Sequence, residues 1–303
     1  MGLDLYNSEK KEPSGAGEVG VNLQWRAADA DVSALAWGFI ERHNRESAGA
    51  ALHFPVAYPV LQVTLAGRYR VELGSRLEAT PTGGLWGSAF EAVRGAPEGS
   101  LHSFAAALTF EGAALLLGGP PSLAANQILD LDALRPCASA NLVERVTGAA
   151  SFEARVRIVQ DFFRGLAART SPRHTDPRIL ALSTEIARDV RGGPVGRLAN
   201  VSGSSERTLY NRVRREIGCG PKRLLRLARL QRLLRAFHPA PFGGKPAVDP
   251  LLEFVDEAHI RREFRALTGM RPSDFESEKR RSGDPVFHSI GADAGAIPAR
   301  PGR

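Results

Sequence analysis

The stretch that most constrains the fold of this chain is residues 205–218, with the sequence SERTLYNRVRREIG. Leu209, Val213 and Ile217 recur every four residues, so on a helix they form one apolar seam. Ser205 is a residue type favoured at a helix N-cap, and Gly218 is a type favoured just past a helix end. The pattern therefore predicts a short helix with an apolar seam and a basic outer surface.

A second short helix is predicted immediately upstream, over residues 195–202, and Gly203 follows it. Two short helices joined by a tight turn that contains glycine form a helix-turn-helix, whose second helix enters the DNA major groove. A basic amphipathic helix that packs on its neighbours and exposes a solvated charged face would show the same pattern. The pattern alone leaves both interpretations open.

The positive charge of the chain is concentrated in its C-terminal part. Residues 176–281 hold 22 of the 40 basic residues and 13 of the 33 acidic residues, a net charge of +9, whereas the whole chain carries +7. This asymmetry predicts a polyanionic partner for the C-terminal part only. A membrane-facing surface is less well supported, because the apolar faces of this part have the spacing of core seams.

Cysteine content and hydrophobicity indicate where the protein resides. Cys137 and Cys219 are too few for a disulfide framework and lack the spacing of zinc ligands. Residues 1–21 contain no apolar core of the signal-peptide type, and no apolar run reaches the length of a membrane span. We therefore expect a cytoplasmic protein without a metal site or a cofactor.

The N-terminal half has strand-like patterning. Alternation over 61–65 and 69–73, with Ala66-Gly67 between them, predicts a hairpin, and further strands are expected over 85–93 and 101–110. A short helix is expected over 31–42, and a loop over 95–100. Together these elements predict a mostly-β sandwich or a partly open barrel.

Helical patterning dominates after a turn at residues 118–121. Helices are predicted over 138–146, 151–168 with Ser151 as N-cap, 178–191, 222–237 with Pro221 at the start, and 256–267. The proline-containing stretch 170–177 predicts a domain boundary. The resulting α+β multidomain chain has a disordered leader (1–20), a β-rich domain with C-terminal helices (21–170), an all-helical domain (176–281) and a disordered tail (282–303).

Residues 195–275 resemble the DNA-binding domain of the AraC family of bacterial transcription regulators. The matching residues, in the order of the family, are Leu198-Ala199, Gly203, Ser205 to Leu209, Gly218, Pro221 to Arg223, Phe254, Asp256, Ala258-His259, Arg262 to Phe264, Leu267 to Gly269 and Pro272. The resemblance implies two helix-turn-helix units joined by one long helix. Residues 59–134 resemble more weakly an uncharacterised β-rich domain found upstream of such domains, through residues 83–87, 115–120 and 130–134, which implies a sensory or dimerising role.

The second helix-turn-helix unit departs from the family pattern. Where its first helix is expected, the sequence has Pro250, which cannot lie inside a helix without the loss of a hydrogen bond but can begin one after Asp249. Glu253 replaces a glycine, and a long proline-rich linker precedes the unit. We therefore expect the second unit to read bases less well than the first.

Candidate DNA contacts follow from the two recognition helices. The resemblance implies base contacts by Arg207, Tyr210 and Asn211 in the first unit and by Glu257, Arg261 and Arg262 in the second. Arg207 suits guanine, Asn211 suits adenine and Glu257 suits cytosine. The candidates for phosphate contact are Ser205, Thr208, Arg212, Arg214, Arg215, Lys222 and Arg223. For each residue the alternative is a backbone contact or a solvated side chain.

The expected function is that of a sequence-specific regulator that binds double-stranded promoter DNA and is not an enzyme. RNA polymerase, a small-molecule effector in the N-terminal domain and a second copy of the chain remain open as further partners. Trp86, Phe104 and Phe110 either line an effector cavity or fill the core, and the filled core is favoured. The main alternative is a small-molecule-binding or catalytic β-barrel with an accessory basic nucleic-acid-binding domain. A non-specific nucleic-acid or RNA binder is a third interpretation.

Overall fold

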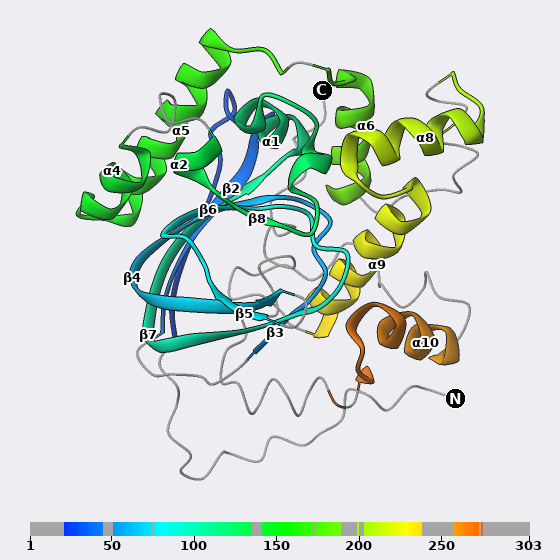
Figure 1. Ribbon diagram of the computed structural model, residues 1–303, viewed down its shortest axis with the longest axis horizontal. Helices are drawn as coiled ribbons and strands as arrows, with labels where there is room; N and C mark the ends of the chain where they lie inside the picture. Colours follow the sequence, from blue (N-terminus) through cyan, green and yellow to red (C-terminus); the bar gives the residue numbers. More distant parts are fainter. Residues whose placement is uncertain are drawn as a thin grey trace.

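The computed structural model describes residues 21–44, 51–73, 76–134, 141–172, 174–188, 199, 203–237, 257–272 and 274. In Figure 1 these residues form a curved β-sheet with helices packed around it. The two ends predicted to be disordered lie outside the described residues. Among the described helices, none combines the length and apolar character needed to cross a membrane.

The strands of the described chain form one antiparallel sheet. The strands are β1 (Val21–Ala27), β2 (Ala36–Asn44), β3 (Ala51–His53), β4 (Val60–Leu73), β5 (Arg76–Ala79), β6 (Gly83–Trp86), β7 (Val93–Leu108) and β8 (Ile128–Asp130). Their order is β1-β2-β7-β4-β6-β8, with β3 paired to β7 and β5 paired to β4. A single sheet with β1 and β8 at its ends corresponds to the partly open form of the predicted β-rich fold.

Strand β4 shows that the predicted hairpin at Ala66-Gly67 is wrong. The strand continues through Gly67 and pairs with β7 on both sides of it. Gly67 has a φ of +85°, and the register of the pairing shifts between Thr64 and Arg68. A glycine with positive φ at a register shift is typical of a β-bulge. The glycine therefore bends a long strand, whereas the sequence suggested a reversal of the chain.

Strands β6 and β7 correct three further predictions. The stretch 95–100, expected as a loop, lies within β7 and pairs with β3 and β4. The strand expected over 85–93 ends at Trp86, and the strand expected over 101–110 ends at Leu108. Loop-type residues such as glycine and proline are tolerated in this part of β7 because it lies beside the short strand β3 and the bulged part of β4.

Strand β2 replaces the helix that was predicted over 31–42. It lies between β1 and β7 and bonds to both, and its first five residues are all buried. A strand that is buried on both faces lacks the apolar–polar alternation of a half-exposed strand. Its apolar residues then fit the spacing of a helix as well as that of a strand. Only the pairing with neighbouring strands decides between helix and strand.

The observed helices agree more closely with the sequence predictions than the strands do. They are α1 (Phe110–Leu117), η1 (Pro121–Ala124), α2 (Leu131–Leu134), α4 (Leu142–Gly148), α5 (Phe152–Arg169), α6 (Pro177–Arg188), α8 (Glu206–Ile217), α9 (Pro221–Phe237) and α10 (Glu257–Thr268). The predicted N-cap of α5 is confirmed, because the Ser151 hydroxyl accepts a hydrogen bond from the Ala154 N–H at 3.2 Å. Most of the predicted helix before α8 lies outside the described residues, although Ala199 is helical.

Both faces of the sheet are covered by helices. On one face, Leu61 belongs to an apolar cluster with α1, α4 and α5, whose members include Phe39, Phe104, Val146, Val156, Val159 and Phe163. On the other face, the preceding residue Val60 belongs to a cluster with the C-terminal helices, whose members include Trp37, Tyr58, Phe90, Ile179, Val213, Leu224, Leu227 and Phe264. Neighbouring residues of a strand point to opposite faces, so β4 packs on both groups of helices.

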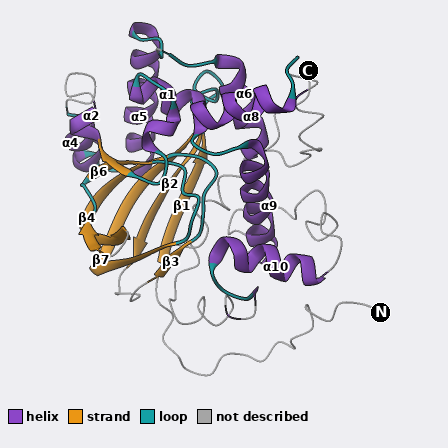
Figure 2. Cartoon of the chain, turned by 45° about the vertical axis from the view of Figure 1, so that its right-hand side comes forward, coloured by secondary structure: helices purple, strands orange, loops and turns teal. Residues whose placement is uncertain are grey.

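The N-terminal and C-terminal parts of the chain therefore share one apolar core. Figures 1 and 2 show α9 running beside the sheet, with α8 at one end and α10 at the other. Polar contacts add to this packing: the Ser122 hydroxyl donates to the Arg215 carbonyl at 2.6 Å, and the Phe110 N–H donates to the Thr184 hydroxyl at 3.0 Å. The phenyl rings of Phe54 and Phe264 lie 6.2 Å apart.

The bulge at Gly67 provides a stability test with a matched control. A Cβ at position 67 would lie 2.1 Å from the Ser100 carbonyl oxygen, whereas a Cβ at Gly99, which also has positive φ, meets no atom within 4 Å. We expect Gly99→Ala to lower the free energy of unfolding by about 1 kcal/mol, and Gly67→Ala by about 3 kcal/mol, because only the latter adds a steric clash to the strain. Urea denaturation measures both, and equal losses would contradict the bulge.

The junction between α8 and α9 provides a chemical test. Burial raises the pKa of the Cys219 thiol to about 12, an effect that the nearby Arg223 only partly opposes. Because each pKa unit changes the thiolate fraction tenfold, we expect native Cys219 to react with a disulfide reagent at pH 8 at least about a thousandfold more slowly than the unfolded chain. The measurement uses the Cys137→Ser variant. Rapid reaction in the native state would show that this junction is open.

Candidate nucleic-acid interface

The turn before α8 and both ends of this helix have the predicted geometry. Gly203 has a φ of +62°, which suits a tight turn. The Ser205 hydroxyl then accepts a hydrogen bond from the Thr208 N–H at 3.2 Å, which caps the helix. At the other end Gly218 has a φ of +94°, and its N–H donates to the Arg214 carbonyl at 2.9 Å. The predicted cap and the predicted stop are both confirmed.

The apolar seam of α8 is fully buried. Leu209, Val213 and Ile217 each have 0% of their surface exposed. Burial of such side chains contributes about 1.5–3 kcal/mol each, so the seam holds α8 firmly against its neighbours. Glu216 is also fully buried and pairs with the guanidinium of Arg215 at 2.9 Å. No sequence pattern indicated this burial, because the glutamate lies beside the seam on a helix that is otherwise strongly basic.

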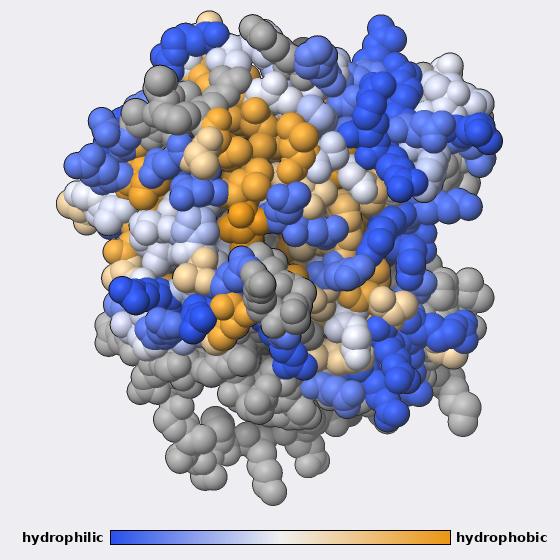
Figure 3. All heavy atoms as spheres, viewed as in Figure 1, coloured by the Kyte–Doolittle hydropathy of each residue, from blue (hydrophilic) through white to orange (hydrophobic). Residues whose placement is uncertain are grey.

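The opposite side of α8 is exposed and carries the three residues of this helix that were predicted to contact bases. Arg207, Tyr210 and Asn211 lie at the surface, and Tyr210 has 43% of its surface exposed. Hydrophilic residues gather along the side of the molecule formed by α8, α9 and α10 (Figure 3). Because the seam is buried, α8 presents only its polar face to solvent.

Tyr210 also contacts the turn that follows its own helix. A Cβ at Gly220 would lie 2.4 Å from Cε2 of the Tyr210 ring. The ring therefore packs directly on the backbone of the α8–α9 junction, and only glycine leaves room for it in this position. This contact restricts the directions in which the side chain of Tyr210 can point.

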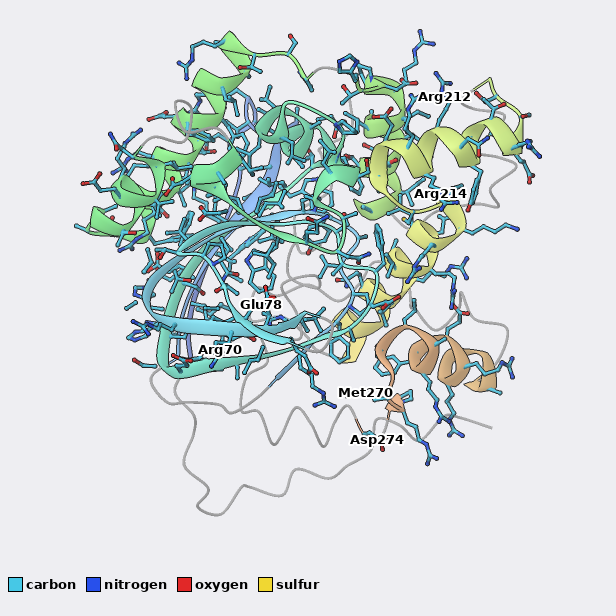
Figure 4. All side chains as sticks on the ribbon, in the orientation of Figure 1. Arg70, Glu78, Arg212, Arg214, Met270 and Asp274 are labelled. Carbon is cyan, nitrogen blue, oxygen red and sulfur yellow. The ribbon has the colours of Figure 1, made fainter. Side chains whose placement is uncertain are left out.

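The predicted phosphate contacts fall into two groups. The first group is exposed and comprises Ser205, Thr208, Arg214 and Lys222. The second group forms ion pairs within the protein and comprises Arg212, Arg215 and Arg223, of which Arg215 and Arg223 are also exposed. Figure 4 shows Arg212 and Arg214 projecting from α8. Only the first group is free of ion pairs among the described residues.

Two arginines of the second group connect α8 and α9 to other elements. Arg212 donates to the Asp176 carboxylate at 2.5 Å, which links α8 to the start of α6. Arg223 donates to the Phe90 carbonyl at 2.9 Å, lies over the Phe90 ring, and pairs with Glu91 at 3.5 Å. Phe90 and Glu91 come from the β-rich part, and no local pattern in the sequence could have placed them here.

The second unit is described only in part. Arg261 and Arg262 are exposed on α10, whereas the side chain of Glu257 and the stretch with Pro250 and Glu253 lie outside the described residues. The apolar side of α10 is confirmed by Phe264, which is 1% exposed. Arg226 of α9 pairs with Glu263 of α10 at 2.8 Å and holds the two helices together.

Helix α9 sets the separation of α8 and α10. It has 17 residues and therefore spans about 25 Å, which places α8 and α10 at opposite ends of it. Successive major grooves on one side of B-DNA are about 34 Å apart. The two exposed helix faces thus have a spacing of the same order as the repeat of the groove.

A cavity of about 790 Å³ lies between the sheet and the α9–α10 pair. Trp86 lines this cavity, in agreement with the interpretation that it lines an effector cavity. Phe104 and Phe110 do not line it, because both are 0% exposed and belong to the apolar core. For these two residues the ligand-lining interpretation was wrong, and the favoured interpretation as core residues was right.

Comparisons with known proteins identify the type of the C-terminal domain. A family model described as a helix-turn-helix domain matches residues 198–278. No curated protein matches the chain significantly. Among solved structures, ToxT from Vibrio cholerae is 8% identical over 86% of this chain and 98% of its own, with a TM-score of 0.46. A ToxT structure with an unsaturated fatty acid bound is 10% identical over 78% and 94%, with a TM-score of 0.45.

A further solved structure is that of CuxR, described as an AraC-like transcriptional activator. It is 16% identical over 72% of this chain and 87% of its own, with a TM-score of 0.28. The segment matched by the family model contains the confirmed cap, seam and stop of α8, together with α9 and α10. The chain therefore carries a helix-turn-helix domain in residues 198–278.

Proposed function

We propose that this protein is a sequence-specific regulator of transcription that reads double-stranded DNA with α8 in a major groove. The observation that carries the proposal is the division of α8 into a fully buried seam and an exposed row formed by Arg207, Tyr210 and Asn211. A helix held in this way presents side chains of the types that bond to base edges.

Affinity comes from the exposed cations around the base-reading row. Arg214 and Lys222 lie at the surface beside it, and each phosphate that they neutralise releases counterions from the DNA. The hydroxyls of Ser205 and Thr208 lie at the start of α8, where the positive end of the helix dipole also favours a phosphate. Binding should therefore weaken steeply as the salt concentration rises.

The second unit extends the contact along the same side of the DNA. Arg261 and Arg262 are exposed on α10, and α9 separates α10 from α8 by about 25 Å, a length that follows from its residue count. In this proposal α8 supplies most of the base readout and α10 supplies mainly phosphate contacts in the next groove. RNA polymerase and a second copy of the chain are further partners of a regulator bound in this way.

A second proposed function is the binding of a small-molecule effector. The cavity of about 790 Å³ supports it, because its size lies within the range of ligand pockets. Its walls come from the β-rich part and from α9 and α10, so a ligand there would touch the DNA-binding domain directly. The rival interpretation as a catalytic β-barrel requires turnover of a small molecule, which detection of a product would reveal.

Sequence preference is tested first on the wild-type protein. The full chain is incubated with a random pool of DNA duplexes, and bound molecules are selected, sequenced and footprinted. We expect a recurrent motif and protection of two neighbouring stretches of major groove. Equal recovery of all sequences would contradict the proposal and favour the non-specific nucleic-acid binder.

Arg207→Ala tests direct readout by α8. On the selected DNA we expect a loss of about 1–3 kcal/mol in binding free energy and a relaxed preference at one base position. The measurement compares selected and scrambled duplexes in fluorescence anisotropy titrations. If both duplexes lost affinity equally, Arg207 would contact only the DNA backbone.

Arg214→Ala is the matched control on the same helix. We expect it to weaken binding to selected and scrambled duplexes alike, and to reduce the slope of log K against log salt by about one unit. Titrations at several salt concentrations measure this slope. A loss confined to the selected duplex would instead assign Arg214 to base readout.

A further inference from the structure

Residues 87–92 connect β6 to β7, and this loop of the β-rich part contacts the first turn of α9. The side chain of Arg223 meets the loop in three ways. Its guanidinium donates to the Phe90 carbonyl at 2.9 Å, lies 5.5 Å from the centre of the Phe90 ring, and pairs with the Glu91 carboxylate at 3.5 Å. The loop therefore holds the guanidinium, although 43% of the Arg223 side chain is exposed.

The loop is itself held in place on two sides. The Phe90 N–H donates to Oδ1 of Asn126 at 2.8 Å, and the Asn126 N–H donates to the Ser88 carbonyl at 2.9 Å. On the other side, Ala89 exchanges two backbone hydrogen bonds with Val56, of 2.9 and 3.0 Å. Because three successive residues are fixed in this way, the carbonyl that accepts from the arginine has one direction.

The neighbouring residue Lys222 shows what the loop changes. Lys222 and Arg223 are adjacent in the first turn of α9, and both were predicted to contact phosphate. Lys222 is exposed and has no ion pair with any described residue, whereas Arg223 is paired with a carboxylate of the β-rich part. Glu91 has 83% of its side chain exposed, so its negative charge would also repel a phosphate beside the arginine.

We propose that residues 87–92 form an autoinhibitory contact, which keeps Arg223 away from a DNA phosphate while the loop has this conformation. The inference rests on the proposed DNA-binding function and adds a control of affinity to it. When the loop releases Arg223, the protein gains one phosphate contact and loses the repulsion by Glu91. Binding then becomes tighter for every DNA sequence, because phosphate contacts are independent of the bases.

The same loop forms part of the wall of the 790 Å³ cavity. Ala89, Glu91 and Asn126 all line this cavity. Asn126 also bonds to Phe90, so it connects the cavity wall to the residue that holds Arg223. A molecule that displaced the Asn126 side chain would remove the support of the loop. The loop therefore connects the contents of the cavity to the affinity for DNA.

Glu91→Gln tests the contact from the loop side, in the full chain. We expect this variant to bind selected and scrambled duplexes about two- to fivefold more tightly than the wild type, the range for one exposed ion pair. The slope of log K against log salt should steepen by up to about one unit. Fluorescence anisotropy titrations at several salt concentrations measure both quantities.

Glu98→Gln is the matched control for this charge change. Glu98 is also an exposed carboxylate in an ion pair, and its partner Arg70 lies on the far side of the sheet from α9 (Figure 4). We expect Glu98→Gln to leave the affinity unchanged. A gain equal to that of Glu91→Gln would show that net charge alone sets the affinity, and it would contradict the proposal.

Arg223→Ala separates release of the arginine from removal of a nearby negative charge. In the Arg223→Ala background, Glu91→Gln should tighten binding by less than about 1.5-fold, because no arginine is left to release. Arg223→Ala alone should weaken binding less than Arg214→Ala does, since Arg214 is already free to contact phosphate. An undiminished gain in the Arg223→Ala background, or equal losses for the two arginines, would overturn the proposal.

Asn126→Gly tests the contact from the cavity side. Asn126 has a φ of +56°, which glycine adopts without strain, so the change removes only the side-chain hydrogen bond to Phe90. We expect a gain in affinity similar to that of Glu91→Gln, again only when Arg223 is present. Gln127→Ala, at the next residue of the cavity wall, should give no gain. Unchanged affinity of Asn126→Gly would contradict the support of the loop.

The contact between the loop and α9 can also be measured without DNA. Urea denaturation of the wild type, Glu91→Gln, Arg223→Ala and the double variant gives the coupling between the two side chains. We expect the double variant to be destabilised less than the sum of the single variants. If the wild type bound no DNA, the proposed function and this inference would both fail. Additive losses in urea, or equal DNA binding by the wild type and Glu91→Gln, would contradict the inference alone.

Discussion

The structure depends on the burial of α9 between two partners. Leu224 and Leu227 belong to the same apolar cluster as Tyr58 and Val60 of the β-rich part and Leu209 of α8. Because α9 contacts both α8 and α10, burial of this one helix fixes three parts together: the sheet, α8 and α10. Apolar burial is non-directional, and the polar contacts of Ser122, Arg223 and Gln231 then select one arrangement.

This arrangement gives the DNA-binding domain a covered side and an open side. Arg223 and the carbonyl of Arg215 are bonded to Phe90 and Ser122 of the β-rich part, so they mark the covered side. Arg207 and Asn211 lie on the open side, where no described element of the β-rich part packs on them. The division explains why basic residues that look equivalent in the sequence differ in their availability to a phosphate.

The local parts of the candidate site could be predicted, and the long-range parts could not. The cap, seam and stop of α8 depend on contacts within a few residues, and Ser205, Val213 and Gly218 encode them directly. The strand nature of β2 depends on two neighbouring strands, and its double burial removed the alternation that would have revealed it. Gly67 was misinterpreted because a turn and a bulge use the same residue type. The hydrogen bonds of Arg223 and Gln231 join residues more than a hundred positions apart in the sequence, and no local pattern predicts them.

The contact between Tyr210 and Gly220 has a consequence for how DNA preference can change during evolution. The aromatic ring packs on a backbone position that lies outside the exposed row of α8. A side chain gained at that glycine would push the ring aside and alter the shape of the exposed face of α8, although the residue types in the exposed row stay the same. If α8 reads DNA as proposed, target preference can thus change through a substitution at the α8–α9 junction, behind the exposed row.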